Sequence, residues 1–539
     1  MRSPFHLLDT DPMTEILEVV PLPPIPIKTS YTSTMSLWLY GILSAWFLYY
    51  VISTARSYWR LRHIKGPPLA AISHLWYVRA AVANKAYLRL SEACDKYGPT
   101  ARIGPNTLVT CDEELIRKMC SVRSSYSRGD WYRAFKFDAD RENLFSEPDE
   151  EKHIKMRMRV TAGYSGKENP TLETDIDRVL WQLFDLIKRK YISRGSDLRP
   201  LDFANTMQFF TLDVITSLSL SQPFGWISED KDMYEYVKTM EENMPAMNFM
   251  SAVPILSRIM RIPAVQRAAL PTVKDRVGMG KIKAVTRDII ARRFGPEKET
   301  KQDITQSFIK HGLTEAEIGD ESLLQILAGS DTSATILRSG FIHIISTPRI
   351  YNRLQAECVN AGVPLTEIIS NTRALDLPYL NAVVKEALRY HPAATGLMPR
   401  KVGLQGDMHK GMYLPPGTEI GFCAWNVYRK NTVYGADADV FRPERWLEAD
   451  EETLARMEKS HELVFGYGKY RCMGEKVARI ELLKTFFELM RRFEFSFIDP
   501  NKPMESDTNY GLWIQKGMWL RVEEHVEVEE MKENKEAVQ

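Results

Sequence analysis

The sequence predicts a mainly α-helical domain with small β-sheets, preceded by one N-terminal transmembrane helix. Three observations favour this fold: an uncharged apolar stretch at residues 35–53, apolar residues at mostly helical spacing from about residue 70 onward, and short strand-like segments such as Thr100–Val109. The 539 residues are 44% apolar, which is enough for a large core. The 71 Lys and Arg nearly cancel the 70 Asp and Glu, which argues against a nucleic-acid-binding protein.

Residues 35–53 (MSLWLYGILSAWFLYYVIS) are close to the roughly 20 residues that cross a bilayer as a helix. The alternatives are a signal-peptide core or a buried helix. Basic residues follow the stretch, which predicts by the positive-inside rule that the larger C-terminal part faces the cytosol. These are Arg56, Arg60, Arg62 and Lys65. We therefore expect a short lumenal segment at 1–34, a transmembrane anchor at 35–53 and a basic linker with Gly-Pro-Pro at 54–68.

Three helices are predicted within the body of the chain. The first begins at Thr314, which forms a capping-box pattern with Glu317, and continues to Ile345 before Pro348. Its length of about thirty residues predicts a helix through the core. The second covers Leu377–Tyr390 and the third Met473–Phe493. We expect one catalytic domain over 69–522 and a charged, solvated tail over 523–539.

One cysteine stands out by its neighbours. The chain has six cysteines and no C-x-x-C pair, so a disulfide framework or a zinc cluster is not expected. Cys472 lies in FGYGKYRCMG (465–474), a glycine-rich loop directly before a helix. A helix N-terminus lowers a thiol's pKa, and a thiolate can bind iron axially. The alternative is an incidental buried cysteine in an ordinary glycine-rich loop.

The loop resembles the haem-binding signature of the cytochrome P450 family, F-x-x-G-x-[R/H]-x-C-x-G. Four positions match it, and Tyr470 departs from it by replacing the usual basic residue; the matches are Phe465, Gly468, Cys472 and Gly474. The resemblance implies the cytochrome P450 fold, with haem b (iron protoporphyrin IX) between the long central helix and the cysteine-loop helix. Cys472 is then the axial iron ligand, and Tyr470 offers a haem propionate a hydrogen bond without charge.

Two further motifs resemble the E-x-x-R helix and the P-x-R segment of the same family. Glu386 and Arg389 lie on one face of the second helix, and Arg445 follows in FRPERW. The resemblance implies that the three side chains form a buried charged network that holds structure and does no chemistry. A surface salt bridge is the alternative for Glu386 and Arg389 alone.

The segment Ala328–Ser333 (AGSDTS) interrupts the central helix with poor helix formers. It resembles the family pattern A-G-x-[D/E]-T-[T/S], in which small residues open a groove for dioxygen. Asp331 and Thr332 are then the catalytic residues that deliver protons. The alternative is a helix kink at which the Thr332 hydroxyl bonds back to a carbonyl.

Further basic residues are assigned by the same resemblance. Arg400 matches an arginine that binds a haem propionate, and His153 and Arg157 stand where the family often has W-x-x-x-R. The alternative for this last pair is an exposed basic helix. Basic residues around the cysteine are a candidate docking face for an acidic redox partner, with solvated surface charge as the alternative; they are Lys469, Arg471 and Lys476.

The resemblance extends over Pro67–Val522 and is closest to the fungal microsomal, pisatin-demethylase-like branch. It implies a monooxygenase that inserts one oxygen atom of dioxygen into an apolar small molecule, with a terpenoid, polyketide or alkaloid of fungal secondary metabolism as the expected class. The implied partners are the membrane-bound NADPH–cytochrome P450 reductase and, as a second donor, cytochrome b5, at the endoplasmic reticulum membrane.

Several alternatives stay open at this point. The enzyme alternatives are a hydroxylase or demethylase that detoxifies plant defence compounds or xenobiotics, and a reductase-independent isomerase or dehydratase. The alternative of another class is a membrane haem-binding protein without catalysis.

Overall fold

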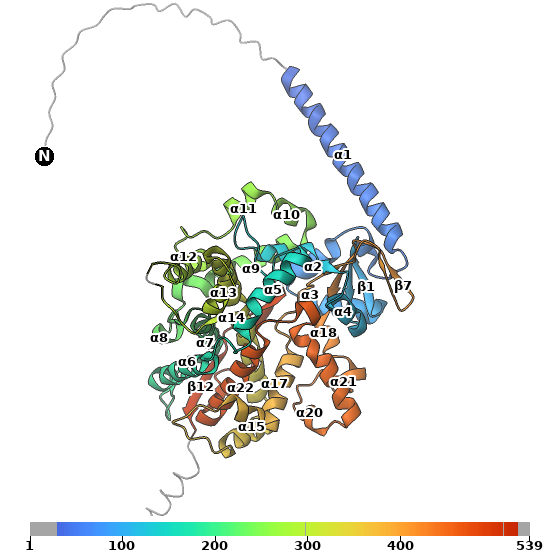
Figure 1. The fold of residues 1–539 in the computed structure, drawn as a ribbon. Coiled ribbons are helices and arrows are strands. Elements are labelled where there is room, and N and C mark those ends of the chain that lie inside the picture. Colours follow the sequence, from blue (N-terminus) through green and yellow to red (C-terminus); the bar gives the residue numbers. More distant parts are fainter. Residues whose placement is uncertain (1–29, 297, 510, 526–539) are drawn as a thin grey trace, which may run out of the picture. The chain divides into compact units, whose positions relative to one another are not determined.

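The computed structural model describes residues 30–296, 298–509 and 511–525, and its contacts divide the chain into two units, Met1–Ala55 and Arg56–Gln539 (Figure 1). Most of the predicted lumenal segment 1–34 and most of the predicted charged tail therefore lie outside the described residues. Glu523 and Glu524, which we assigned to the tail, instead belong to the last strand, where Glu523 pairs with Glu494.

The described part of the first unit is helical, within α1 (Ser30–Leu61). Among the residues that the structure describes, no helix is both long and apolar enough to span a membrane. The transmembrane anchor at 35–53 is not confirmed and stays a prediction. The predicted linker at 54–68 begins as helix, because no Gly or Pro interrupts the chain before Gly66-Pro67-Pro68.

The second unit is mainly helical. Its α-helices up to the central one are α2 (Leu75–Val82), α3 (Ala86–Tyr97), α4 (Glu113–Cys120), α5 (Glu150–Tyr164), α6 (Leu172–Leu186), α7 (Phe203–Leu220), α8 (Trp226–Glu229), α9 (Tyr236–Ala252), α10 (Pro254–Ile259), α11 (Pro263–Ala269), α12 (Gly278–Ala291), α13 (Ile304–Lys310) and α14 (Glu315–Ile345). The remaining ones are α15 (Pro348–Asn360), α16 (Asn371–Leu375), α17 (Pro378–Tyr390), α18 (Ala424–Val427), α19 (Asn431–Tyr434), α20 (Arg445–Glu448), α21 (Glu451–His461) and α22 (Glu475–Arg492).

The strands form four small sheets. Their bounds are β1 (Thr100–Gly104), β2 (Thr107–Thr110), β3 (Ser127–Arg128), β4 (Leu201–Asp202), β5 (Arg400–Lys401), β6 (Asp407–His409), β7 (Met412–Leu414), β8 (Glu419–Phe422), β9 (Phe493–Phe497), β10 (Glu505–Asn509), β11 (Leu512–Lys516) and β12 (Trp519–Glu524). The largest sheet has the order β1-β2-β8-β5-β3, and β2 and β8 are its parallel pair. The others are β4-β12-β9, β10-β11 and β6-β7. The predicted strand-like segment Thr100–Val109 is the β1–β2 hairpin.

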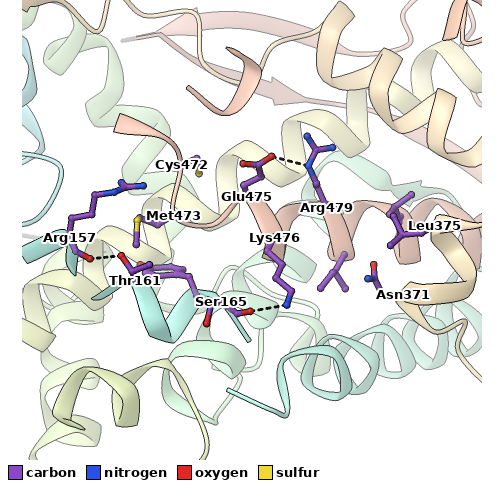
Figure 2. Close-up of a pocket in the computed structure, with 13 residues that line it drawn as sticks. Arg157, Thr161, Ser165, Asn371, Leu375, Cys472, Met473, Glu475, Lys476 and Arg479 are labelled. Carbon is purple, nitrogen blue, oxygen red and sulfur yellow. Dashed lines mark hydrogen bonds and ion pairs between the residues drawn. The ribbon is translucent and has the colours of Figure 1, made fainter. Parts of the chain in front are cut away.

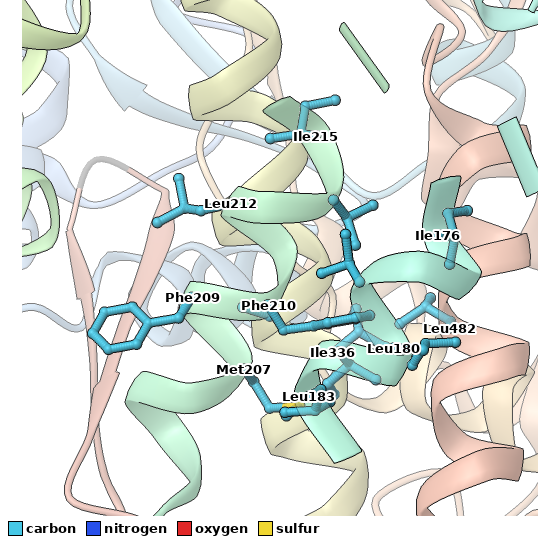
Figure 3. Packing of buried hydrophobic residues seen from close by; sticks show 14 of the residues in the cluster. Ile176, Leu180, Leu183, Met207, Phe209, Phe210, Leu212, Ile215, Ile336 and Leu482 are labelled. Carbon is cyan, nitrogen blue, oxygen red and sulfur yellow. The ribbon is translucent and has the colours of Figure 1, made fainter. Parts of the chain in front are cut away.

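The three predicted helices are confirmed within a few residues at each end. The central helix α14 has the predicted capping box: Thr314 Oγ1 accepts the backbone N–H of Glu317, and the Glu317 carboxylate accepts that of Thr314. It packs most extensively against α7. Figure 3 shows hydrophobic side chains of α6 and α7, including Phe209 and Phe210, that pack in the core with Ile336 of α14 and Leu482 of α22. This dense core fixes α14 relative to the helix that follows Cys472.

Candidate active site

The cysteine loop ends at the N-terminus of α22, as predicted. The Cys472 backbone N–H donates to the Phe465 carbonyl at 2.7 Å, which closes the loop. Gly468 has φ +57°, and a Cβ there would lie 2.2 Å from the Cys120 carbonyl oxygen, so this position requires glycine. At Gly474, by contrast, a Cβ would lie 4.0 Å from the Cys472 sulfur. The Arg479 guanidinium covers the Phe465 ring at 4.9 Å.

The Cys472 side chain opens into a cavity of about 440 Å³ (Figure 2). Residues of α5, α16 and α22 line the cavity with the cysteine loop; among them are Arg157, Thr161, Tyr164, Leu375, Met473 and Lys476. Burial raises the pKa of the Cys472 thiol, whereas the backbone N–H groups of Gly474 and Glu475 and the charge of Arg157 lower it. The expected lowering by the helix terminus is thus present but does not outweigh burial. A coordinating metal deprotonates such a thiol outright.

A second group of polar residues surrounds Tyr470. The Arg400 guanidinium lies 3.8 Å from the Tyr470 ring centroid, the Arg128 guanidinium 5.4 Å and the Lys469 ammonium 5.2 Å. The His153 ring stacks on it at 5.8 Å. Burial, followed by the charges of neighbouring Arg and Lys side chains, lowers the pKa of His153 to about 2, so this histidine is neutral. Sequence reasoning missed Arg128, since nothing in Ser127-Arg128-Gly129 indicates a site.

The residues around Tyr470 carry more positive than negative charge. Whether haem b fits the site can therefore be judged by whether it supplies the missing negative charge. Among the described residues, the Glu150 carboxylate contacts this group of cations. One of its oxygens lies 3.2 Å from the Lys469 ammonium, and the other accepts a hydrogen bond from the Arg128 backbone N–H. Arg400 Nε and His153 Nδ1 are buried without a hydrogen-bond partner among the described residues. Buried guanidinium groups such as those of Arg128 and Arg400 require anions beside them. The propionate carboxylates of haem b suit them, and the thiol of Cys472 suits the iron.

The predicted docking face is corrected at one position. Lys469 is buried and donates to the carbonyls of Ser124 and Tyr126, so it cannot meet a partner protein. Arg471 is partly exposed and forms ion pairs with Glu475 and Glu462. Lys476 remains exposed.

The structure brings the three predicted network residues together. The Arg389 guanidinium donates to both Glu386 carboxylate oxygens, at 2.7 and 2.8 Å, and Arg445 Nε donates to one of them at 3.1 Å. All three side chains are fully or almost fully buried. Trp446 Nε1 also donates to Glu386, at 3.0 Å, and Arg389 binds the carbonyls of Tyr428 and Ala438. The network therefore ties α17 to the segment that precedes the cysteine loop.

The small residues in the middle of α14 serve two different purposes. Ala328 is exposed, whereas Leu327 before it is buried and Gly329 after it is half-buried. Gly329 instead permits close packing, because a Cβ there would lie 2.9 Å from Ile215 of α7. The Thr332 hydroxyl donates to the Ala328 carbonyl at 2.8 Å, which is the back-bonded arrangement given above as the alternative.

Asp331 faces α7. Gln208 Nε2 donates to Asp331 Oδ1 at 2.7 Å. Burial raises the pKa of Asp331 to about 6, and the charge of Arg338 and the hydrogen bond from Gln208 oppose this rise. A carboxyl with this pKa both holds and releases a proton near neutral pH. Gln208 and Arg338 could not be recognised from the sequence, because they belong to no motif.

A thiol at a helix N-terminus that opens into a cavity, with buried cations beside it, is the arrangement expected of a haem-thiolate protein. The chain belongs to the cytochrome P450 family, whose model matches residues 65–520. It is 40% identical over 499 residues to cytochrome P450 monooxygenase ABA1 of Pyricularia oryzae, covering 91% of this chain and 97% of that one. It is 35% identical to aba1 of Botryotinia fuckeliana over 472 residues (86% and 92%). It is 30% identical to gsfF of Penicillium aethiopicum over 503 residues (90% and 96%).

Membership of this family settles the cofactor and the class of enzyme. Cytochromes P450 use haem b, and the relatives are monooxygenases, so the chain is an oxidoreductase.

Proposed function

We propose that this protein inserts one oxygen atom of dioxygen into an apolar small molecule, as a step in fungal secondary-metabolite biosynthesis. The observation that carries the proposal is the Cys472 thiol, which lies at the start of α22 and opens into a cavity shared with Arg157. The fungal monooxygenases to which the chain is similar along most of its length support the biosynthetic assignment. A detoxifying hydroxylase would use the same residues.

The residues of this chain hold the cofactor and manage protons. Haem b supplies the binding and activation of dioxygen, with charge donated to the iron by a thiolate. Cys472 holds the iron, and Arg128, Arg157, Arg400 and His153 hold the propionates. Tyr470 keeps Arg400 in place by ring stacking rather than by charge. Asp331 passes protons toward Thr332, and the core around α14 excludes bulk water.

Electrons come from an NADPH-dependent reductase in this proposal. The exposed Lys476 and the partly exposed Arg479, at the same cavity, offer positive charge to an acidic partner near Cys472. Attachment to the endoplasmic reticulum membrane through residues 35–53 completes the proposal, because membrane-bound reductase and enzyme then share one surface. The uncharged sequence of that stretch supports it.

The test is the carbon monoxide difference spectrum of the reduced protein. We expect the red-shifted band that gives the family its name in the wild type and in Cys358→Ala, whose cysteine is buried in α15. We expect Cys472→Ala to lose it. A wild type that is folded and supplied with haem but gives no such band contradicts the proposal. Product formation from candidate terpenoids, polyketides and alkaloids, with reductase and NADPH, then tests the substrate class.

A further inference from the structure

A small cavity with both polar and apolar side chains in its wall lies beside the middle of α14, separate from the one at Cys472. Its volume of about 30 Å³ has room for about two water molecules. Side chains of α7, α9, α14 and β11 line it, and the polar ones that matter here are Gln208, Glu241, Asp331, Arg338 and Gln515. Because several of these groups form hydrogen bonds, the cavity suits water rather than an apolar ligand.

Gln515 gives independent evidence for water. Its side chain is 3% exposed, and its Oε1 has no hydrogen-bond partner among the described residues. The amide nitrogen of the same side chain donates to Ser339 Oγ at 3.0 Å, which leaves the oxygen to accept from elsewhere. A buried amide oxygen without a donor is unfavourable, and water in the adjoining cavity satisfies it.

The side-chain amide of Gln208 bridges Asp331 and Arg338, and only one of its two orientations satisfies both hydrogen bonds. Its Nε2 donates to Asp331 Oδ1 at 2.7 Å, and its Oε1 accepts from Arg338 Nη2 at 2.9 Å. Arg338 Nε donates to the Ala204 carbonyl at 2.8 Å, which anchors the guanidinium. A flipped amide would turn its oxygen toward the carboxylate and its NH₂ toward the guanidinium, so the flip is excluded. The Asp331 carboxylate is thus held at the wall of the cavity.

Glu241 joins the cavity to solvent. It lines the cavity, yet its side chain keeps 29% of its surface exposed and pairs with the Lys516 ammonium at 2.8 Å. The charged and titratable groups that act on Asp331 are Arg338 of α14 and Glu241 of α9, and the buried Tyr236 of α9 also lies at the cavity. Glu241 is the one of these with contact to bulk water in the described structure.

We propose that Gln208 is a positioning residue for Asp331, and that protons travel from solvent at Glu241 through water in this cavity to Asp331. The inference rests on the proposed monooxygenase function and deepens it. In each turnover the reductase supplies the electrons, and protons from solvent combine with the oxygen atom that leaves as water. Asp331 gives up a proton toward Thr332 and is reprotonated from the cavity, so the carboxyl is unchanged after the cycle.

The first test is an infrared titration of the Asp331 carboxyl in the holoprotein, isolated by subtracting the spectrum of Asp331→Asn. Gln208→Ala removes a hydrogen bond to the ionised Asp331 carboxylate, so the titration midpoint of Asp331 rises by about one pH unit in this variant. Glu241→Gln removes a negative charge near Asp331, so the titration midpoint of Asp331 falls in this variant. The matched control Glu242→Gln changes an exposed carboxylate on the same helix and leaves the midpoint at the wild-type value.

The second test uses dioxygen as the probe, with reductase, NADPH and no added substrate. Gln208→Ala and Glu241→Gln raise the hydrogen peroxide formed per NADPH and change the solvent deuterium isotope effect on that ratio, whereas Glu242→Gln does neither. Gln355→Ala controls for the loss of a half-buried amide elsewhere. The carbon monoxide spectrum stays that of the wild type in all four variants.

Midpoints and peroxide ratios that match the wild type in both Gln208→Ala and Glu241→Gln overturn the inference, and so do midpoints that shift in the same direction. Glu241 lies at the surface, so its variant decides the matter even where Gln208→Ala does not fold. A wild type without the red-shifted carbon monoxide band contradicts the proposed function instead. In that case the infrared titration still measures whether Gln208 and Glu241 act on the Asp331 carboxyl.

Discussion

Arg128 and Arg400 lie directly opposite one another in the antiparallel pair of β3 and β5, and both side chains are buried. Like charges at opposite positions of a sheet destabilise it, and burial increases the effect. Arg128 is stabilised by the carbonyls of Leu144 and Phe145, which its guanidinium binds at 2.7 and 2.8 Å. An anion between the two guanidinium groups would offset their repulsion, and we propose that a haem propionate supplies it.

Arg400→Gln is expected to weaken haem binding by about tenfold to a hundredfold, because a hydrogen bond to a charged group contributes about 1.5–3 kcal/mol. The rate of haem transfer to apomyoglobin measures this. Arg123→Gln, at an exposed arginine five residues before Arg128, is the control and keeps the wild-type rate. Equal rates for the two variants would show that Arg400 does not hold a propionate.

Glu386→Gln is expected to lower the free energy of unfolding by about 3–5 kcal/mol, because it leaves the buried Arg389 and Arg445 without their counter-charge. Denaturant unfolding of the holoprotein measures the loss. The control is Glu458→Gln, whose carboxylate pairs with Lys385 and is 42% exposed, and which should change stability by about 1 kcal/mol or less. Similar losses in the two variants would contradict the buried network.

Asp331 makes stability depend on pH in a defined direction. Its pKa is raised from 3.8 to about 6, so between these values the folded state holds a proton that the unfolded state has released. The contribution of this group is therefore greatest below about pH 4 and is lost as the pH rises through about 6. In Asp331→Asn that part of the pH dependence disappears. The free energy of unfolding, measured from pH 4 to pH 8, should lose in the variant the decrease with pH that Asp331 contributes. An identical pH dependence in the wild type and the variant would refute the raised pKa.

Gly468→Ala separates steric exclusion from backbone strain. Gly417 also has a positive φ, +73°, but a Cβ there meets nothing within 4 Å. Gly417→Ala should therefore cost only about 1–2 kcal/mol for the left-handed backbone. Gly468→Ala adds a clash with the Cys120 carbonyl and should cost more, with loss of bound haem as the loop shifts. Haem content and unfolding midpoints of the two variants test this, and equal effects would argue against the clash.

Local patterns in the sequence were enough to locate the helices and the cysteine loop. Apolar spacing and the capping box placed α14, because these signals depend on neighbours in the chain. The residues that we expect to bind haem were assigned from short motifs that resemble those of the family. Lys469 shows where this reasoning stopped: it stands among glycines in an exposed-looking loop, yet α5 supplies Glu150 and buries it.

Contacts between distant segments could not be read from one sequence. Gly329 looked like an opening beside the haem, but its small size accommodates Ile215, which lies more than a hundred positions earlier. Arg128 and Arg400 meet because β3 and β5 pair across the same sheet, and Gln208 reaches Asp331 because α7 crosses α14. Such pairings are set by tertiary packing, which leaves no periodic signal.

Of the six cysteines, five are buried and Cys472 alone is exposed, where it opens into a cavity. The thiol that we propose as the iron ligand is thus also the one that a small alkylating reagent can reach. Modification by iodoacetamide should occur at Cys472 in protein prepared without haem and be prevented in protein loaded with it. The ratio of modified to unmodified Cys472 peptide then reports cofactor occupancy directly, including in whole cells where absorption spectra are obscured.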